Sequence, residues 1–345
     1  MLGRKTVGPT LPPELERIVF ELAARAATPT QVYFLLFVAA RVKIWVEPYL
    51  YRVLYIAKPI AVPQQHRHPF PIARIMPHQR RNRHGFTPVP LEVLRRLVET
   101  HHFAACKTVE HAFFDNVFRL EGSDIISEFF SLCPNIVSLS LPGSPLAFLG
   151  ETFPASDNLH HLSANLLTLL PLKKQRINFK HPIFRNLTHL EVLGDTIPFV
   201  PTPPYQNIYR IPRLTHIAFQ SSVLANMLSA QITKMAQLEC IVVLHLDDRT
   251  HKIASDLETD ERFVIVEQAS NTVDLWIDAV THPSGYWGRA EAFIAAKRAG
   301  KIDRRIHDLR AFINSLIETV GNIYHSSVTN PDFEKLKHPN EDFYN

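Results

Sequence analysis

The sequence contains little cysteine and little glycine, and it lacks a run of apolar residues long enough to cross a membrane. Its 345 residues include 3 Cys and 11 Gly. The Cys, at positions 106, 133 and 240, are odd in number and give no disulfide framework, which is typical of a reducing compartment. The longest apolar run is 32–40, whereas a membrane span needs about 20 residues. No apolar segment follows Arg4 and Lys5, so we expect no secretory signal and an intracellular protein, cytoplasmic or nuclear.

Neither sign of charge dominates the chain. It has 37 Lys+Arg and 33 Asp+Glu, a balance that does not favour nucleic acid as a partner. The segment 48–91 lacks Asp and Glu and is rich in Arg, His and Pro. Because proline interrupts helices and central strands, we predict a basic, Pro-rich linker over 57–90. A nuclear-localisation patch at 80–83 and a contact with an acidic surface are alternatives to a solvated loop.

Motifs for chemistry are absent as well. There is no Gly-x-Ser-x-Gly, no Gly-x-Gly-x-x-Gly and no P-loop lysine motif. The adjacent pairs His101-His102 and His160-His161 point in different directions, and His66-x-His68 has no Cys or acid beside it. We therefore expect no catalytic residue, no cofactor and no metal. An enzyme would become the better interpretation if a deep pocket gathered several His and acids with shifted pKa values.

The N-terminal region predicts a small helical module. Pro12 and Pro13 suit a first helical turn, and apolar residues then recur at i, i+3, i+4 and i+7 from Leu15 onward. Thr28 and Gln31 are placed as a capping box for a second helix, about 29–45, which is apolar on all sides near its start. A short turn near 49–51 and a strand over 52–56 are expected to follow.

The module resembles an F-box, and more narrowly the large F-box-like families of mushroom-forming fungi. The resemblance lies in Leu-Pro-x-Glu-Leu at 11–15, Ile-Val-Phe at 18–20, the segment 39–45 and Leu-Tyr-Arg at 50–52. It implies docking on the Skp adaptor of cullin-RING ubiquitin ligases. The implied contacts are Leu11, Pro12, Glu14, Leu15, Ile18, Val42 and Trp45. The second helix is more hydrophobic than is usual in the family, and the alternative is that these apolar residues form only the core of a helical hairpin.

Beyond a short amphipathic helix at 91–100, an apolar pattern recurs six times. An apolar residue is followed three and five positions later by two more, and the copies begin at 109, 136, 159, 187, 214 and 238. These starts are 23 to 28 residues apart, which resembles leucine-rich repeats. One strand per repeat buries its side chains only when the next repeat stacks on it. We predict a short, irregular, parallel-stranded solenoid, with return helices near 129–130 and 227–228. A two-layer α/β domain is the alternative.

The C-terminal part changes character. An acidic stretch over 247–261 precedes a strand at 262–266, a helix at 287–298 and a second helix at 305–324. Gly300 is a natural stop for the first of these helices. We interpret this part as a closing cap of the repeat array, and Trp276, Tyr286 and Trp287 as core residues.

These observations predict an α/β protein in five segments. They are an F-box-like helical module (1–56), the linker (57–90), a leucine-rich-repeat-like region (91–246), a strand–helix cap (247–330) and a polar tail (331–345). The expected function is that of a substrate-recognition adaptor in a Skp–cullin–F-box type ubiquitin ligase. Its expected partners are the Skp adaptor, through it a cullin, and an unknown protein target, with no nucleic acid and no membrane. An interaction scaffold with a vestigial F-box is the alternative.

Overall fold

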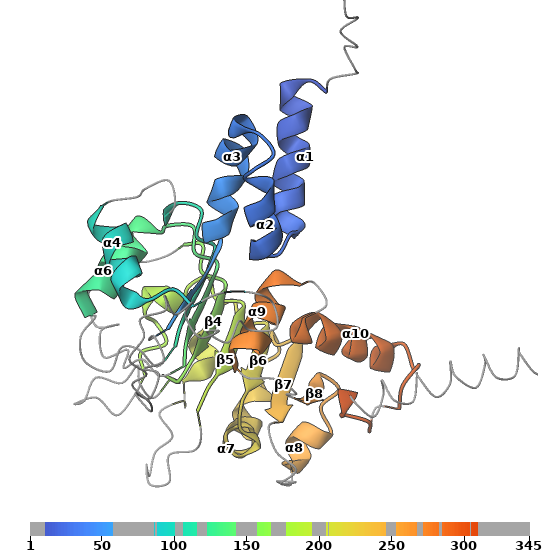
Figure 1. The fold of residues 1–345 in the computed structure, drawn as a ribbon. Helices are drawn as coiled ribbons and strands as arrows, with labels where there is room; N and C mark the ends of the chain where they lie inside the picture. The colour runs from blue at the N-terminus through green and yellow to red at the C-terminus, as the bar shows by residue number, and fades with distance from the viewer. Residues whose placement is uncertain are drawn as a thin grey trace, which may run out of the picture.

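The computed structural model describes residues 11–57, 86, 88–100, 106–115, 123–142, 157–166, 177–194, 205, 207–245, 253–267, 272–282, 285–303 and 305–309. Three short helices come first and project from one end of an eight-stranded sheet (Figure 1). None of the described helices combines the length and the apolar character that crossing a membrane requires.

The sheet is entirely parallel, and its strands follow one another in the order of the chain. Parallel neighbours require a crossover connection, so the chain returns to the same end of the sheet before each new strand. The α/β class is therefore confirmed. The strands are β1 (Val53–Ile56), β2 (His111–Phe114), β3 (Ser138–Leu141), β4 (His161–Ala164), β5 (His189–Val192), β6 (His216–Phe219), β7 (Cys240–His245) and β8 (Phe263–Glu267).

The six copies of the sequence pattern lie in register across the sheet. Their middle residues are buried and pair with one another on neighbouring strands. The row runs through Ala112, Leu139, Leu162, Leu190, Ile217 and Ile241. The prediction of one strand in each copy is confirmed, and so are the predicted strands at 52–56 and 262–266.

Because successive side chains of a strand point to opposite sides, the sheet has two different faces. One face carries the buried row and, together with the helices that cover it, forms the largest core of the described residues. The predicted helices at 91–100, 129–130 and 227–228 lie on this side. They are α4 (Leu91–Glu99), α6 (Ser123–Leu132) and α7 (Ser222–Ile232); the short helices η5 (Pro182–Phe184), η6 (Ile208–Arg210) and α8 (Ser255–Glu258) lie in other connections.

The opposite face is covered by α9 (Thr272–Thr281) and α10 (Tyr286–Arg298). Trp276 of α9 packs on Phe113 of β2, with 5.4 Å between the ring centroids, whereas α10 packs against β5 to β8. The C-terminal part, interpreted from the sequence as a closing cap of the repeat array, therefore also reaches strands at the start of the sheet. Large apolar side chains such as Phe113 lie on this face at the start of the sheet, and they are stabilised by a cover that reaches them.

Several features of the C-terminal part match the sequence analysis. Gly300 follows α10 with a φ of 70°, the left-handed conformation typical of a helix stop. Trp276, Tyr286 and Trp287 are buried, as expected of core residues. β8 pairs with β7, so the expected boundary at 246/247 falls within one sheet. The predicted helix 305–324 lies mostly outside the described residues, as do most of the linker 57–90 and the whole tail 331–345.

The N-terminal module consists of α1 (Pro13–Ala26), α2 (Pro29–Leu35), α3 (Ala40–Val46) and the 3-10 helix η1 (Glu47–Tyr51). The capping box forms, because the Thr28 hydroxyl accepts from the Gln31 N–H and the Gln31 side chain accepts from the Thr28 N–H. The prediction of one continuous helix over 29–45 is wrong. The chain turns at 36–38 and is extended at Ala39, which brings α3 back beside α2. This turn allows Val32 and Val42 to share one small core.

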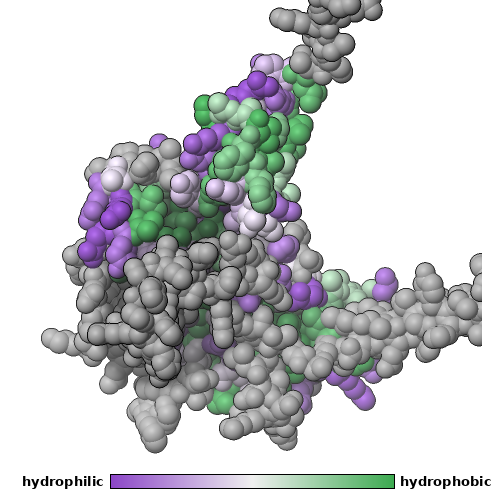
Figure 2. Space-filling view, viewed as in Figure 1, coloured by the Kyte–Doolittle hydropathy of each residue, from purple (hydrophilic) through white to green (hydrophobic). Residues whose placement is uncertain are grey.

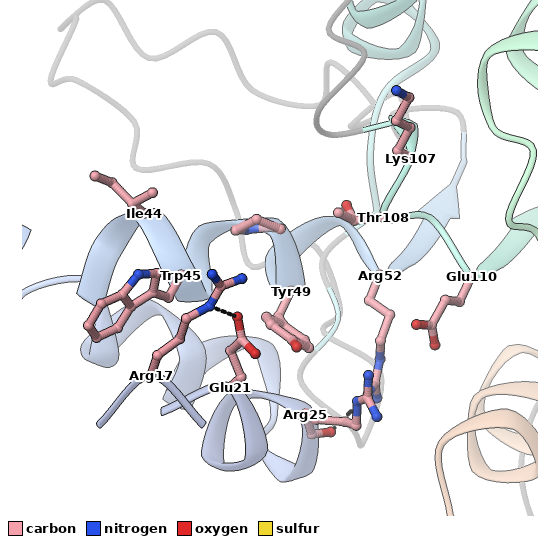
Figure 3. Close-up of a pocket in the computed structure, with 11 residues that line it drawn as sticks. Arg17, Glu21, Arg25, Ile44, Trp45, Tyr49, Arg52, Lys107, Thr108 and Glu110 are labelled. Atoms are coloured by element: carbon pink, nitrogen blue, oxygen red, sulfur yellow. Dashed lines mark hydrogen bonds and ion pairs between the residues drawn. The ribbon is translucent and has the colours of Figure 1, made fainter. Parts of the chain in front are cut away.

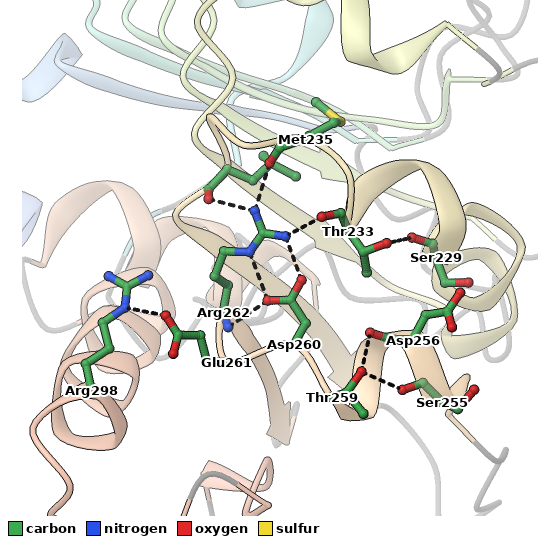
Figure 4. Close-up of polar contacts among 11 residues, drawn as sticks. Ser229, Thr233, Met235, Ser255, Asp256, Thr259, Asp260, Glu261, Arg262 and Arg298 are labelled. Carbon is green, nitrogen blue, oxygen red and sulfur yellow. Dashed lines mark hydrogen bonds and ion pairs between the residues drawn. The ribbon is translucent and has the colours of Figure 1, made fainter.

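A partly buried arginine, Arg262, connects β8 to the preceding repeat (Figure 4). Arg262 donates to both carboxylate oxygens of Asp260, at 2.8 and 2.6 Å. Its remaining N–H groups donate to the carbonyls of Thr233, Met235 and Leu238, at 2.9, 2.8 and 3.1 Å. All five N–H groups of a guanidinium are thereby paired, which a lysine cannot reproduce.

Arg262→Lys should lower the free energy of unfolding by about 2 kcal/mol, because an ammonium group donates at most three hydrogen bonds and leaves part-buried acceptors unpaired. Arg298→Lys is the matched control, since Arg298 pairs with Glu261 at 3.4 Å and both side chains are about half exposed. It should cost less than about 1 kcal/mol. Chemical denaturation of both variants measures the difference, and equal costs would contradict this role for Arg262.

Candidate functional site

α1 turns its apolar stripe away from the rest of the protein. The stripe is spaced i, i+3, i+4 and i+7, and it is exposed at Leu15, Ile18, Val19 and Leu22. The opposite side of α1 makes the internal contacts. Ala24 is buried with Phe20 packed beside it, and Glu16 accepts two hydrogen bonds from Arg41 of α3, at 2.9 and 3.0 Å. The contacts that attach α1 to the rest of the module therefore come from the side of the helix opposite the apolar stripe.

Exposed aromatic side chains also lie on α2 and on the turn that follows it. Tyr33 and Phe37 are in edge-to-face contact at 5.1 Å, and Phe37 is 70% exposed. Figure 2 shows apolar side chains gathered on the part of the protein that projects from the sheet. We call this set the apolar surface of the module. It consists of Leu11, Leu15, Ile18, Val19, Leu22, Tyr33, Phe34, Phe37, Val38 and Ile44.

The residues implied by the F-box resemblance do not all lie on this surface. Leu11, Pro12, Glu14, Leu15 and Ile18 are exposed at the start of α1. Trp45 is half-buried. Val42 is wholly buried in the core of the module, so its expected role as a surface contact is corrected. The sequence pattern did not single out Phe34 and Phe37, because an all-apolar run does not reveal which of its side chains face solvent.

A pocket of about 440 Å³ lies where the module meets the sheet (Figure 3). Trp45 and Tyr49 contribute aromatic side chains to its lining. Arg17 pairs with Glu21 at 2.7 Å, and Arg52 donates to the carbonyl of Arg25 at 3.0 Å. The full lining is Arg17, Glu21, Arg25, Ile44, Trp45, Pro48, Tyr49, Arg52, Lys107, Thr108 and Glu110. Its charged groups are more often basic than acidic.

A second group of polar residues lies on the sheet face beneath α9 and α10. Four strands begin with histidine, and the parallel register aligns these positions. The rings of His161 and His189 stack at 4.0 Å, and those of His189 and His216 stack at 4.1 Å. We call His111, His161, His189 and His216 the histidine row. The side chains of the row are held at a fixed spacing by the backbone pairing of the sheet.

Threonines orient two of these rings. The Thr188 hydroxyl lies 2.9 Å from Nδ1 of His189, and the Thr215 hydroxyl lies 2.8 Å from Nδ1 of His216. Each hydroxyl also donates to a carbonyl of the preceding repeat, at 3.2 Å for Thr188 and 3.3 Å for Thr215. When a hydroxyl uses its single proton for the carbonyl, it accepts from Nδ1–H, and Nε2 of that ring then carries the lone pair.

α10 closes over the end of the row. Glu291 Oε1 lies 3.0 Å from His216 Nε2, and Trp287 meets the rings of His189 and His216 edge-on at 5.2 and 5.6 Å. Burial lowers the pKa of His111 to about 3, of His161 to about 4 and of His189 to about 2. Burial also lowers the pKa of His216, against the opposing effect of Glu291. These rings are therefore neutral at physiological pH.

A buried acid lies beside the row. Glu191 accepts a hydrogen bond from the Tyr286 hydroxyl at 3.3 Å, and burial raises its pKa to about 7. The cavity next to these groups measures only about 10 Å³, close to the least volume that holds one water molecule. This face brings together ionisable side chains with shifted pKa values but offers little room for a substrate.

The histidine row was missed in the sequence, although a signal for it is present. Two repeats share Leu-Thr-His, at 187–189 and 214–216. Equal positions in stacked repeats lie side by side, so a histidine repeated at one position predicts adjacent rings. The sequence analysis compared His160 only with His161, the next residue in the chain. The ring contact of His161 is instead with His189, on the neighbouring strand.

Comparison with protein-family models, curated proteins and solved structures finds no match to this chain. Its candidate sites are therefore defined by geometry, as the apolar surface of the module and the histidine row. Cys106, Cys133 and Cys240 are buried free thiols, and burial raises the pKa of each. Such thiols are weak nucleophiles.

One further ionisable group is buried in α10. Lys297 Nζ donates to the Phe263 carbonyl at 3.0 Å and lies 2.9 Å from His307 Nδ1. Burial lowers the pKa of Lys297 to about 8. An unfolded lysine keeps its proton up to about pH 10.4, so above pH 8 the unfolded chain binds more protons than the folded one. The contribution of Lys297 to stability therefore rises with pH.

Between pH 8 and pH 9, the stability of the wild type should rise by about 1 kcal/mol relative to that of Lys297→Met. Urea denaturation of both proteins at each pH gives the difference and cancels the other groups that titrate. A constant difference from pH 7 to pH 9 would show that Lys297 retains an ordinary pKa in the folded protein.

Proposed function

We propose that this chain is the substrate-recognition subunit of a Skp–cullin–F-box type ubiquitin ligase. In this proposal the apolar surface of the module binds the Skp adaptor, and through it a cullin, while the repeat region binds a protein target. The chain itself makes and breaks no bond. The proposal rests on the F-box resemblance of residues 11–56 and on one structural observation, the outward-facing apolar stripe of α1.

Covering the apolar surface of the module with a partner would be energetically favourable. Helices on the surface of a globular protein normally turn their apolar stripe toward the core. Among the described residues, most of the large apolar side chains that remain exposed fall within 11–44. Burying one such side chain contributes about 1.5–3 kcal/mol, and a large exposed apolar patch marks an interaction site. A protein partner that covers α1 and α2 would gain this free energy several times over.

The geometry also refines the proposed contacts. Leu15 and Ile18 remain candidates, being 49% and 50% exposed. Phe34 and Phe37 take the place of Val42, since they are exposed and Val42 is not. Aromatic side chains of this kind are common anchors in protein interfaces.

We interpret the sheet as an irregular solenoid similar to leucine-rich repeats. This is supported by strands in sequence order, by one buried row and by a spacing of 23 to 28 residues between the pattern starts at 109, 136, 159, 187, 214 and 238. The face that would remain for a target is partly taken by α9 and α10. The proposal for the target is therefore restricted to other surfaces of the repeat region.

One observation favours a second candidate, a scaffold whose F-box-like module is only a folded cap. The module has a small core of its own, formed by Ala24, Val32, Val42 and Val46. Such a module could remain folded without any partner. Binding to the adaptor separates the two candidates.

Leu15→Asp combined with Ile18→Asp should weaken binding to a Skp-type adaptor at least about a hundredfold, because two apolar anchors are lost and charge enters a desolvated contact. Val93→Asp on α4 is the matched control, since Val93 is 44% exposed and lies outside the module. It should leave binding unchanged. The measurement is calorimetric titration of each purified full chain with adaptor.

Thermal unfolding monitored by circular dichroism verifies that each variant is folded. If the double variant binds as tightly as the wild type, the proposed contact is wrong. If the folded wild type does not bind the adaptor, the scaffold becomes the better candidate.

A further inference from the structure

We propose that His189, His216 and Glu291 form a binding site for one divalent transition-metal ion, with Zn²⁺ as the first candidate. One ligand atom from each residue lies within 4.8 Å of the other two. The residues come from β5, β6 and α10, so the metal would join the sheet to the helix that covers it. The sequence alone led us to expect no metal site. The three residues lie outside the N-terminal module, so this proposal does not depend on adaptor binding.

The orientation of the rings is the first argument. The threonine hydroxyls contact Nδ1 of both histidines, and in the tautomer in which they accept from Nδ1–H, Nε2 of each ring carries a lone pair. In zinc sites the second ring nitrogen of a ligating histidine is usually fixed by a hydrogen bond of this kind. Thr188 and Thr215 therefore orient the two rings as supporting groups in a metal site do.

The contact with Glu291 is the second argument. Nε2 of His216 lies 3.0 Å from a carboxylate oxygen of Glu291 and is buried without a hydrogen-bond partner among the described residues. In the tautomer that carries its lone pair on Nε2, two electron-rich atoms at this distance repel each other unless a cation lies between or beside them. The cation can be a proton or a metal ion. A lone proton would satisfy His216 and Glu291 but would leave Nε2 of His189 without a role, whereas a metal ion uses all three groups.

The ligand chemistry selects the class of metal. Two imidazoles and one carboxylate form a donor set found in zinc sites, with a fourth position open to water. Zn²⁺ holds its ligands at about 2 Å, so neighbouring ligand atoms lie about 3.3 Å apart. The contact at 3.0 Å already meets this spacing. The rings of His189 and His216 stack within 12° of parallel, so both rings must rotate toward each other before their Nε2 atoms can share one ion.

The surroundings provide both shelter and access. Trp287 covers the two rings edge-on, and the stacking of His161 on His189 supports them from behind. The side chain of Glu291 is 53% exposed, so an ion can enter from solvent at this end of the row. A bound ion would fasten α10 to β5 and β6, which couples metal binding to stability.

Zn²⁺ titration of the metal-stripped full chain, in competition with a chromophoric chelator, tests the site. The wild type should bind one ion and unfold at a higher temperature when loaded. Glu291→Gln and His189→Gln should each weaken the affinity at least about tenfold. Because Glu291 lies at the surface, Glu291→Gln keeps the fold and carries the test if His189→Gln does not fold.

Two controls separate this site from other histidines. His111→Gln changes the same row three strands away from His189 and should bind Zn²⁺ as the wild type does. The pair His66→Gln and His68→Gln removes the His-x-His motif of the sequence and should also leave binding intact. The inference is overturned if the chain binds no Zn²⁺, if Glu291→Gln and His189→Gln both bind normally, or if the binding is lost with His66 and His68.

Discussion

The parallel pairing of β1 to β8 in sequence order is the constraint on which the rest of the structure depends. A strand of four to six residues cannot bury its side chains alone, so each needs its neighbours at a fixed register. The row from Ala112 to Ile241 is the result. The same register aligns the residues at the start of each strand, and it brings histidines far apart in the chain to a ring spacing of 4.0 to 4.1 Å. The core and the histidine row are thus two consequences of one repeat.

The helical module follows a different rule. It is held together by a small core and by the pairing of Arg41 with Glu16, while its apolar stripe faces outward. A helix that needed its apolar face for its own stability would turn that face inward. The proposed ligase function connects the two parts, because one surface would bind the adaptor while the repeats present others to a target. The covering of one sheet face by α9 and α10 limits where that target could bind.

Much of the fold was predictable from the sequence. The spacing of Leu187, Leu214 and Leu238 located strands, and Pro13, Thr28 and Gly300 located helix ends, because these signals are local. The break at Ala39 was not predictable, since nothing in an all-apolar run marks where it turns. The position of α9 and α10 depends on contacts with Phe113 and other distant residues. For the candidate sites, the resemblance implied contacts at Leu15 and Ile18, which are exposed, and at Val42, which is buried. To predict the histidine row, one must know that residues at equal positions in successive repeats become neighbours in the sheet.

The central claim is that a separate protein covers the apolar surface of the module. Hydroxyl-radical footprinting of the full chain, with and without a saturating Skp-type adaptor, measures the exposure of individual side chains directly. The account predicts that oxidation of Leu15, Phe34 and Phe37 falls when the adaptor is present, while Met227, exposed on α7, is oxidised equally in both samples. Unchanged oxidation of Phe34 and Phe37 with saturating adaptor would contradict it.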